Sequence, residues 1–174
     1  MLNIFVNTWG NYNVHGADGG EWVTLPMDAD ELENELARIA AAMGDNDPEW
    51  AIHDFEWTSE IELREINELE NINELNEELQ EIDSLDEWEQ EEIAAAMEAF
   101  EHNFCVALEY QRSGYYTFYR GMDLTDVAEE LVNECYFTRN TPDIFTRYFD
   151  YEAFGRDLRF DGYEETKYGV IYCC

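Results

Sequence analysis

The chain has 174 residues, of which 45% are apolar and 15% aromatic, enough to build small hydrophobic cores. Its 42 acidic and nine basic residues give a formal net charge of −33, which excludes ordinary nucleic-acid binding because that requires a basic surface. The same charge disfavours anionic lipid, and we find no apolar window of the roughly 18 residues that a membrane span needs. Since the N-terminus also lacks a signal-peptide pattern, we expect a cytoplasmic protein whose natural partner is a basic surface.

The first 59 residues predict a small α/β module. Residues 2–9 and 21–25 predict two strands joined by a long turn-rich loop, and residues 50–57 predict a third strand. Asp28 is placed to cap an intervening helix that ends at Gly44. The apolar residues of this helix that should face the core are Leu32, Leu36, Ile39 and Met43.

Residues 60–101 contain 17 acidic residues and a single basic one, Arg64, which gives a local net charge of −16. Apolar residues recur here mostly at steps of three and four, so the stretch predicts folded helices rather than a disordered acidic tail. Ser59 and Ser84 are each followed three residues later by Glu, and both fit capping boxes that divide the stretch into two or three helices. Like charges at helical spacing cost roughly 0.2–0.5 kcal/mol each, so something other than stability favours them.

Residues 103–174 predict a second α/β module. The predicted strands cover residues 104–110, 115–119, 160–163 and 168–173, and the predicted helices run from Asp123 to Tyr136 and from Asp150 to Leu158. The whole pattern predicts an α+β chain with elongated, end-to-end packing of three modules. Two small antiparallel-sheet modules, residues 1–59 and 103–174, flank an acidic helical module, residues 60–102.

Motifs typical of enzymes and metal sites are missing from the sequence. The four cysteines include no CxxC pair and predict reduced thiols, two of which, Cys105 and Cys135, we place in the core. His53 lies in a predicted strand and is expected to be a structural hydrogen-bonding residue. Residues 45–47 resemble the start of a calcium loop but lack the following Gly and the terminal Glu. We therefore expect no catalytic residue, no metal and no cofactor.

Three segments carry recognisable motifs. The first contains the pairs Tyr12-Asn13, His15-Gly16 and Glu21-Trp22, and the second is Glu-Trp-Ala-Ile-His-Asp-Phe-Glu at residues 49–56. The third and most specific is Tyr-Phe-Asp-Tyr-Glu-Ala-Phe-Gly-Arg-Asp-Leu at residues 148–158. In this combination the chain resembles the ArdA-type antirestriction proteins carried by bacterial conjugative plasmids and transposons.

This resemblance implies a strongly acidic homodimer, built from three modules in a curved rod, whose carboxylates stand where bent B-form DNA presents phosphates. The implied partner is a type I restriction-modification enzyme, bound in the DNA groove of its methyltransferase and specificity-subunit core. The resemblance also places an antirestriction motif on residues 124–135. Residues 14–20 and 60–101 depart from the family's usual pattern, which leaves the path of the acidic stripe open.

The residues support phosphate mimicry by themselves. One carboxylate every two or three helical residues gives about 4 Å of rise each, close to the roughly 3.4 Å per phosphate of one DNA strand. We expect a distributed row in which no single residue is essential. The predicted partner-binding residues are Glu60, Glu62, Glu65, Glu68, Glu70, Glu74, Glu77, Glu78, Glu81, Asp83, Asp86, Glu87, Glu89, Glu91, Glu92, Asp126, Glu129, Glu130 and Glu134.

Two alternatives remain open. An acidic chaperone, or a sequestering partner for a basic protein, needs only a diffuse charge, whereas mimicry needs ordered rows of carboxylates. A carboxylate-dependent hydrolase would instead require a water-excluded pocket that contains a carboxyl of strongly raised pKa.

Overall fold

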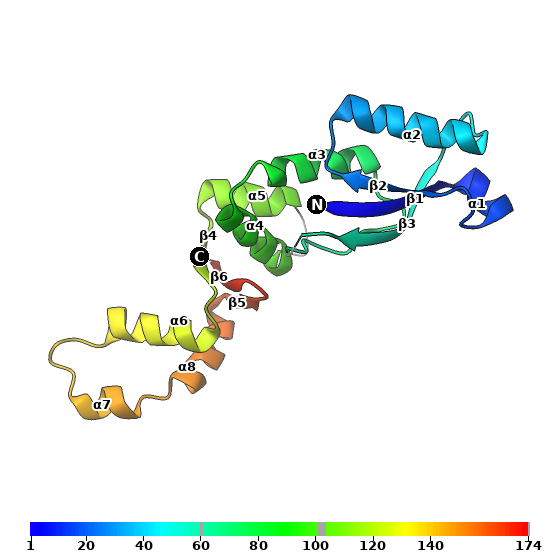
Figure 1. The fold of residues 1–174 in the computed structure, drawn as a ribbon. Coiled ribbons are helices and arrows are strands. Elements are labelled where there is room, and N and C mark those ends of the chain that lie inside the picture. The colour runs from blue at the N-terminus through cyan, green and yellow to red at the C-terminus, as the bar shows by residue number, and fades with distance from the viewer. Residues whose placement is uncertain (60, 101–103, 174) are drawn as a thin grey trace. The chain divides into compact units, whose positions relative to one another are not determined.

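A computed structural model describes residues 1–59, 61–100 and 104–173 (Figure 1). Its helices and two small antiparallel sheets confirm the predicted α+β class. The chain divides into two compact units, residues 1–90 and 91–174, and the boundary falls within helix α4 (Glu87–Ala99). The division into three modules stays a prediction. The expectations for Glu60 and Cys174 fall outside the described residues.

The sheet of the first unit has the strand order β2-β1-β3, with both pairs antiparallel. Its strands are β1 (Leu2–Thr8), β2 (Glu21–Leu25) and β3 (Trp50–Trp57), as the alternating pattern predicts. Leu2, Ile4 and Val6 alternate along β1 and are fully buried on the face that the helices cover. On the other face, the ring of Phe5 packs against that of Trp22 at 5.4 Å. One face of the sheet is therefore core and the other is open.

Helix α2 (Ala29–Met43) forms where the sequence predicts it. The carboxylate of Asp28 accepts from the amides of Asp30 and Glu31, and Gly44 ends the helix with a φ of 72°. The expected core face is buried except for Met43, which is half-buried. The predicted loop before β2 contains a short helix, α1 (Trp9–His15), because the Thr8 hydroxyl caps it by accepting from the amide of Asn11.

The acidic stretch begins as an irregular segment, so the expected capping at Ser59 is wrong. Residues 61–70 are held to β3 instead: the amide of Ile52 donates to the carbonyl of Glu68 at 2.9 Å, and the Trp57 indole donates to the carbonyl of Arg64 at 3.1 Å. Those bonds override the helical pattern. Two helices follow, α3 (Ile72–Asp83), capped by Asn71, and α4.

Ser84 does not cap α4 either, because it is the last-turn residue of α3 and its hydroxyl donates to the carbonyl of Glu81. The capping box of α4 is formed by Asp86 and Glu89, each of which accepts from the other's amide. The division of the stretch into two helices is confirmed in the described residues.

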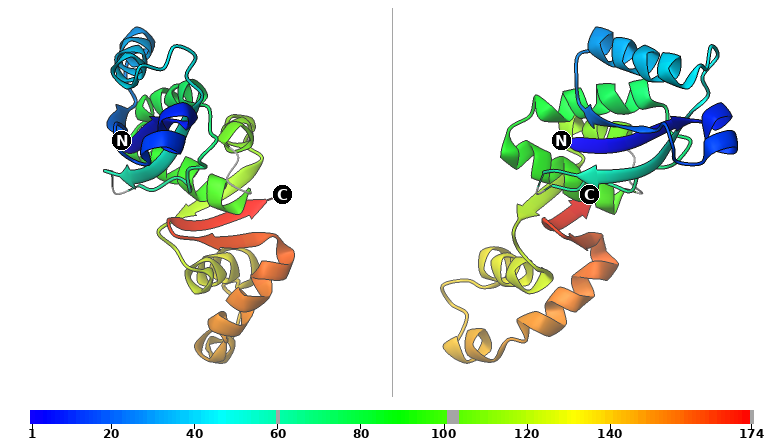
Figure 2. Two further views of the ribbon diagram at one scale, coloured as in Figure 1. Left: turned by 90° about the vertical axis from the view of Figure 1, so that its right-hand side faces the viewer. Right: turned by 45° about the vertical axis from the view of Figure 1, so that its right-hand side comes forward.

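The sheet of the second unit has the strand order β4-β6-β5 and is antiparallel throughout. Figure 2 shows this sheet between helix α5 on one side and helices α6 and α8 on the other. The strands are β4 (Tyr116–Arg120), β5 (Tyr163–Thr166) and β6 (Gly169–Cys173). The helices are α5 (Phe104–Ser113), α6 (Leu124–Leu131), the π-helix η1 (Val132–Tyr136), α7 (Asp143–Tyr148), α8 (Tyr151–Leu158) and the 3₁₀-helix η2 (Arg159–Asp161).

Three expectations for this unit are wrong. Residues 104–110 form α5 rather than a strand, because Phe104, Ala107 and Leu108 lie at helical spacing and are buried on one face. Cys105 and Cys135 are exposed rather than buried. The strand expected from residue 160 begins at Tyr163, since η2 occupies the preceding residues.

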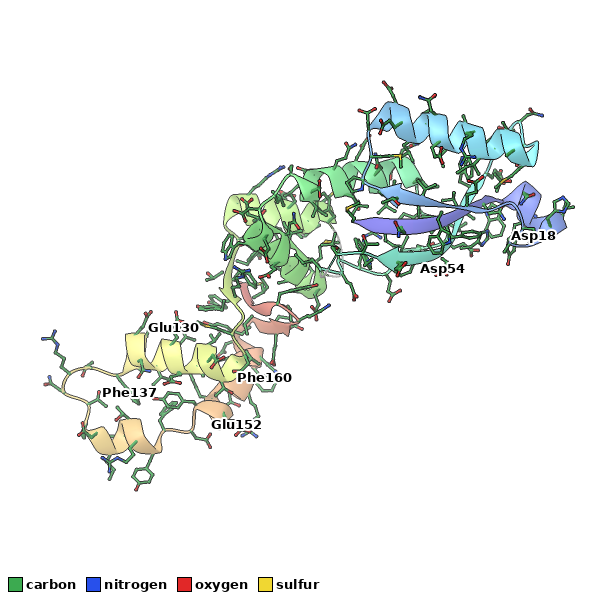
Figure 3. All side chains as sticks on the ribbon, in the orientation of Figure 1. Asp18, Asp54, Glu130, Phe137, Glu152 and Phe160 are labelled. Carbon is green, nitrogen blue, oxygen red and sulfur yellow. The ribbon has the colours of Figure 1, made fainter. Side chains whose placement is uncertain are left out.

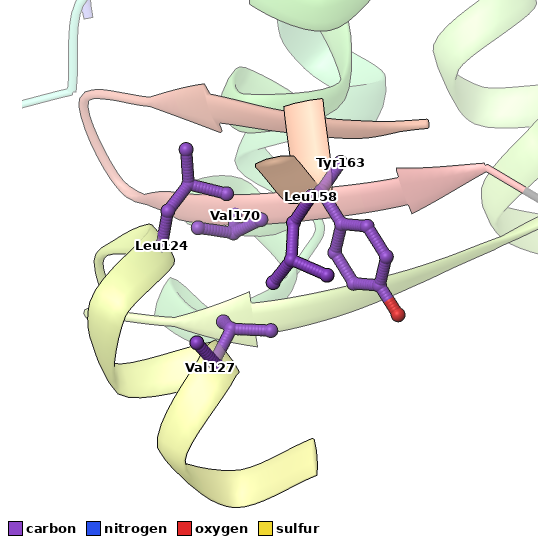
Figure 4. Close-up of a cluster of buried hydrophobic side chains, with 6 residues drawn as sticks. Leu124, Val127, Leu158, Tyr163 and Val170 are labelled. Carbon is purple, nitrogen blue, oxygen red and sulfur yellow. The ribbon is translucent and has the colours of Figure 1, made fainter. Parts of the chain in front are cut away.

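The core of this unit is a cluster contributed by α6, α8, β5 and β6 (Figure 4). Leu124 and Val127 of α6 meet Leu158 of α8 and Val170 of β6 there. The close approach of α8 to α6 depends on Gly155, because a Cβ at that position would lie 2.6 Å from the carbonyl oxygen of Leu124. The packing of α8 against α6 thus explains why the third motif has glycine at position 155.

Candidate carboxylate interface

The negative charge is concentrated in the first unit. Residues 1–90 contain 25 acidic and two basic residues, a net charge of −23, whereas residues 91–174 contain 17 and seven, a net charge of −10. Both basic residues of the first unit pair with its own carboxylates. Arg38 contacts Glu21 at 2.6 Å and Glu35 at 2.8 Å, and Arg64 contacts Glu70 and Glu78. The unit therefore presents acidic groups with no unpaired arginine among them.

The predicted carboxylates are spread over several elements. Glu60 lies outside the described residues. The irregular segment holds Glu62, Glu65, Glu68 and Glu70; α3 holds Glu74, Glu77, Glu78, Glu81 and Asp83; Asp86 precedes Glu87, Glu89, Glu91 and Glu92 of α4; Asp126, Glu129 and Glu130 lie on α6, and Glu134 on η1.

Arg64 holds the irregular segment against α3. One guanidinium nitrogen donates to Glu70 at 2.9 Å and another donates to Glu78 at 3.0 Å, while the arginine side chain is only 15% exposed. Burial raises the pKa of Glu70, but the hydrogen bonds from Arg64 and from the amide of Asn67 outweigh it, so that the pKa lies below its ordinary value. Both glutamates that contact Arg64 therefore serve the fold.

Other predicted residues are also engaged inside the molecule. Glu91 pairs with Arg120, and Glu92 accepts from the side-chain amide of Gln111 at 2.9 Å. Asp126 completes the capping box of α6 with Asp123. For Glu91 and Glu92 sequence spacing does not reveal these contacts, because the partners lie 29 and 19 residues away along the chain, whereas the box of Asp123 and Asp126 is local.

A second group of predicted carboxylates points to solvent. Its members are exposed and make no hydrogen bond or ion pair within the described part of the chain: Glu65, Glu77, Asp83, Glu87, Glu129 and Glu134. On α3, Glu74, Glu77 and Glu81 follow at steps of three and four residues, which is about 4.5 and 6 Å of helical rise. Of these three, Glu77 belongs to the solvent-facing group, whereas Glu74 accepts a hydrogen bond from the side-chain amide of Asn71 at 3.0 Å.

Exposed acids also occur outside the predicted set. Glu31 and Glu33 lie on α2, and Asp54 and Glu56 alternate along β3. Figure 3 shows Asp54 on the side of the first unit away from α2. The period-two spacing in β3 was the signal that could have found this pair, because it places both carboxylates on the open face of the sheet.

No group of three or more potential metal ligands occurs in residues 1–59, 61–100 and 104–173. Over the same ranges, we find no helix that is both long and apolar enough to cross a membrane. The pKa values of the Glu35 and Glu70 carboxyls lie below their ordinary values, the direction that keeps these two groups charged.

A family model described as "Antirestriction protein (ArdA)" matches residues 4–172. The chain belongs to this family. The resemblance read from the three motifs is thereby confirmed, and the ArdA family is one of inhibitors rather than catalysts. No individual curated protein gives a significant match.

In this ArdA-family chain, several of the motif residues serve the fold. The His53 ring of the second motif stacks on Tyr12 of the first at 4.1 Å, and its Nδ1 lies 3.3 Å from a carboxylate oxygen of Glu68. Gly155 of the third motif lets α8 approach α6. The second motif also carries exposed carboxylates, those of Asp54 and Glu56.

Proposed function

We propose that this protein inhibits type I restriction-modification enzymes by occupying their DNA-binding groove as a DNA mimic. The observation that carries the proposal is the charge of the first unit, whose two arginines are both neutralised by its own glutamates. Membership of the ArdA family supplies the antirestriction role. The enzyme's methyltransferase and specificity-subunit core is the proposed target, and the cytoplasm is the proposed place of action.

Inhibition follows from the same physics that brings the enzyme to DNA. A groove lined by lysine and arginine attracts phosphates at long range, and a protein of net charge −33 enters the same field. Binding should be fast and should weaken as salt rises, because screening and competition from free ions oppose it. The energy is spread over many exposed carboxylates, so no single residue dominates.

Competition tests this mechanism. The protein is titrated into a type I methyltransferase core bound to labelled duplex DNA, at low and at high salt. We expect displacement of the duplex at low salt and a steep loss of displacement at high salt. Absence of displacement at every salt concentration would refute the mimic and favour the acidic chaperone or sequestering partner.

We also propose that the protein is a homodimer whose contact lies in residues 136–160. This segment carries four acidic and four basic residues, so it is neutral in a chain of net charge −33 and offers a second copy the least repulsion. It also exposes large apolar side chains: Tyr136, Ile144, Phe145, Tyr148 and Phe160 are each more than 60% accessible. Apolar side chains in a neutral segment suit an interface between copies.

Light scattering at micromolar concentration tests the dimer. The unchanged protein should have twice the chain mass, and a variant with Phe145→Ser and Tyr148→Ser should have a lower mass at the same concentration. Both residues are exposed, so the substitutions leave the core intact. A monomeric mass for the unchanged protein would contradict the proposal.

A further inference from the structure

A groove of about 570 Å³ lies between helices α2 and α3 of the first unit. Ala29, Leu32, Glu33, Leu36 and Ala37 line it from α2 at steps of three and four residues, so one face of that helix forms a wall. Asn73, Asn76 and Glu77 line it from α3, again one helical face. Its volume falls within the roughly 300–1,000 Å³ of typical ligand sites. Figure 1 shows the two helices as neighbours.

The floor of the groove is apolar and its rims are acidic. The exposed Ala29 and Ala37 and the half-buried Trp50 supply apolar surface above the buried Leu32 and Leu36. Glu33 and Glu77 are exposed, one on each helix. A carboxylate thus stands on either side of an apolar trough.

One end of the groove is fixed by a buried amide. The side chain of Asn76, which is 2% exposed, accepts from the amide of Met27 and donates to its carbonyl, both at 2.9 Å. Since Met27 immediately precedes the cap of α2, this double bond ties α3 to the start of α2. The groove is therefore held open by the fold and does not need an occupant to form.

We propose that this groove binds a basic peptide segment of the inhibited enzyme, in which an apolar side chain is flanked by lysine or arginine. The apolar side chain enters the trough, and the flanking cations meet Glu33 and Glu77. Charge complementarity selects this occupant, because the acidic rims disfavour an anionic or a purely apolar one. This inference rests on the proposed function, since the partner is the same basic enzyme.

Such an anchor has a consequence that carboxylate rows lack. Apolar burial is not screened by salt, so the groove contributes the part of the affinity that remains when ionic contacts are weakened. The anchor also fixes the position of the inhibitor along the enzyme's groove, because the apolar side chain fits the trough at one position. Rows of charges alone allow several neighbouring positions.

A pair of peptides tests the groove without the enzyme. The probes are Ac-Lys-Arg-Phe-Arg-Lys-amide and the same peptide with Ser in place of Phe, added to ¹⁵N-labelled protein. We expect the Phe peptide to bind about tenfold tighter, as burial of one aromatic side chain implies. Its shifts should centre on the Trp50 indole and on the side-chain amides of Asn73 and Asn76. Equal affinities, or shifts centred elsewhere, would overturn the proposal.

Two matched substitutions on one helix provide the control. Ala37→Leu fills the groove from an exposed position of α2, whereas Ala42→Leu makes the same change on that helix outside the groove. Ala37→Leu should abolish the preference for the Phe peptide and leave binding of the Ser peptide unchanged. Ala42→Leu should preserve the preference. A preference that survives Ala37→Leu would show that the trough is not the site.

The same variants in the competition assay separate this inference from the proposed function. At high salt, Ala37→Leu should raise the concentration needed to displace duplex about tenfold relative to Ala42→Leu, with a smaller difference at low salt. If the unchanged protein displaces duplex but the two variants need equal concentrations to do so, the groove proposal is wrong and the proposed function stands. If the unchanged protein does not displace duplex at all, the proposed function fails, whatever the peptides show.

Discussion

Arg64 is the residue on which the irregular acidic segment depends. Arg64→Met keeps the apolar stem but leaves Glu70 and Glu78 partly buried without a cation, so we expect a loss of about 2–3 kcal/mol of unfolding free energy. Urea denaturation at neutral pH measures it. Arg38→Met is the control, because Arg38 is half exposed and its removal should change stability little.

The pH dependence of the Arg64→Met effect provides a second readout. The pKa of Glu70 is lowered in the folded state, so its pairing contributes stability above the ordinary carboxyl pKa of 4.5. That contribution is lost as the pH falls through the lowered folded value. The difference between wild type and variant should be largest near neutral pH and should shrink below about pH 4.5. A difference that grows on acidification would contradict this assignment.

Gly155 allows a second test at the residue scale, in which a normally stabilising substitution should destabilise the protein. In an ordinary helix Gly→Ala is stabilising by about 1 kcal/mol, but here the new Cβ meets the backbone of Leu124, so Gly155→Ala should destabilise by about 1–3 kcal/mol. Thermal unfolding gives the sign. Gly10→Ala is the control, because the atom nearest to its new Cβ, at 3.0 Å, belongs to the movable side chain of Asp45. A stabilised Gly155→Ala variant would show that α6 and α8 do not approach as closely as described.

At the scale of elements, α3 tests whether the placement of charge matters. Replacing Glu74, Glu77 and Glu81 by Gln and Asp83 by Asn should weaken inhibition about tenfold, since each exposed ion pair contributes roughly 0.3–0.5 kcal/mol and four of them add. Each single change should weaken it about twofold. The titration against duplex-bound enzyme measures both, together with a shallower salt dependence in the block variant.

The control for the α3 variant removes the same number of charges elsewhere. Four exposed acids of the second unit, outside the predicted set and outside the proposed dimer contact, serve for this: Glu98, Glu109, Asp161 and Glu164. Their neutralisation should cost much less inhibition than the α3 block. Equal losses would mean that total charge governs binding, as expected for an acidic chaperone.

Elements were predictable where several local signals agreed. For α2, the cap at Asp28, the apolar period and the stop at Gly44 all give the same helix. Residues 104–110 were mispredicted, because a short apolar run rich in aromatic and β-branched residues fits either a strand or a buried helix. Residues 61–70 were mispredicted because their structure is set by hydrogen bonds to β3, which no local pattern encodes.

The sequence predicts which stretch carries the carboxylates of the candidate site, but it does not predict which of them face solvent. The density of acids identifies the stretch, but which glutamates serve the fold depends on where the few arginines lie in space. Glu70 and Glu78 look in sequence like Glu74 and Glu77, yet only the first two contact Arg64. Spacing along one helix does not record this pairing, because Arg64 lies in the irregular segment that precedes α3.

For the whole molecule, the net charge predicts that added salt increases stability and weakens binding to the enzyme. Self-repulsion of a chain with net charge −33 opposes folding, and salt screens it. We expect the Tm to rise by several degrees between about 20 and 300 mM NaCl, whereas inhibition weakens over the same range. Differential scanning fluorimetry measures the Tm, and the competition assay measures the inhibition. A Tm that falls with salt would mean that ion pairs, rather than repulsion, dominate the folded state.

The pairing of Arg38 and Arg64 also bears on how such an inhibitor coexists with the genome. A protein with free cationic side chains would be drawn to the chromosome, which vastly outnumbers any restriction enzyme. Here the arginines of the first unit are already held by neighbouring glutamates, so that unit is repelled by DNA. In the proposed mechanism, the first unit is therefore not sequestered by a large excess of DNA, and the enzyme's own substrate does not deplete it.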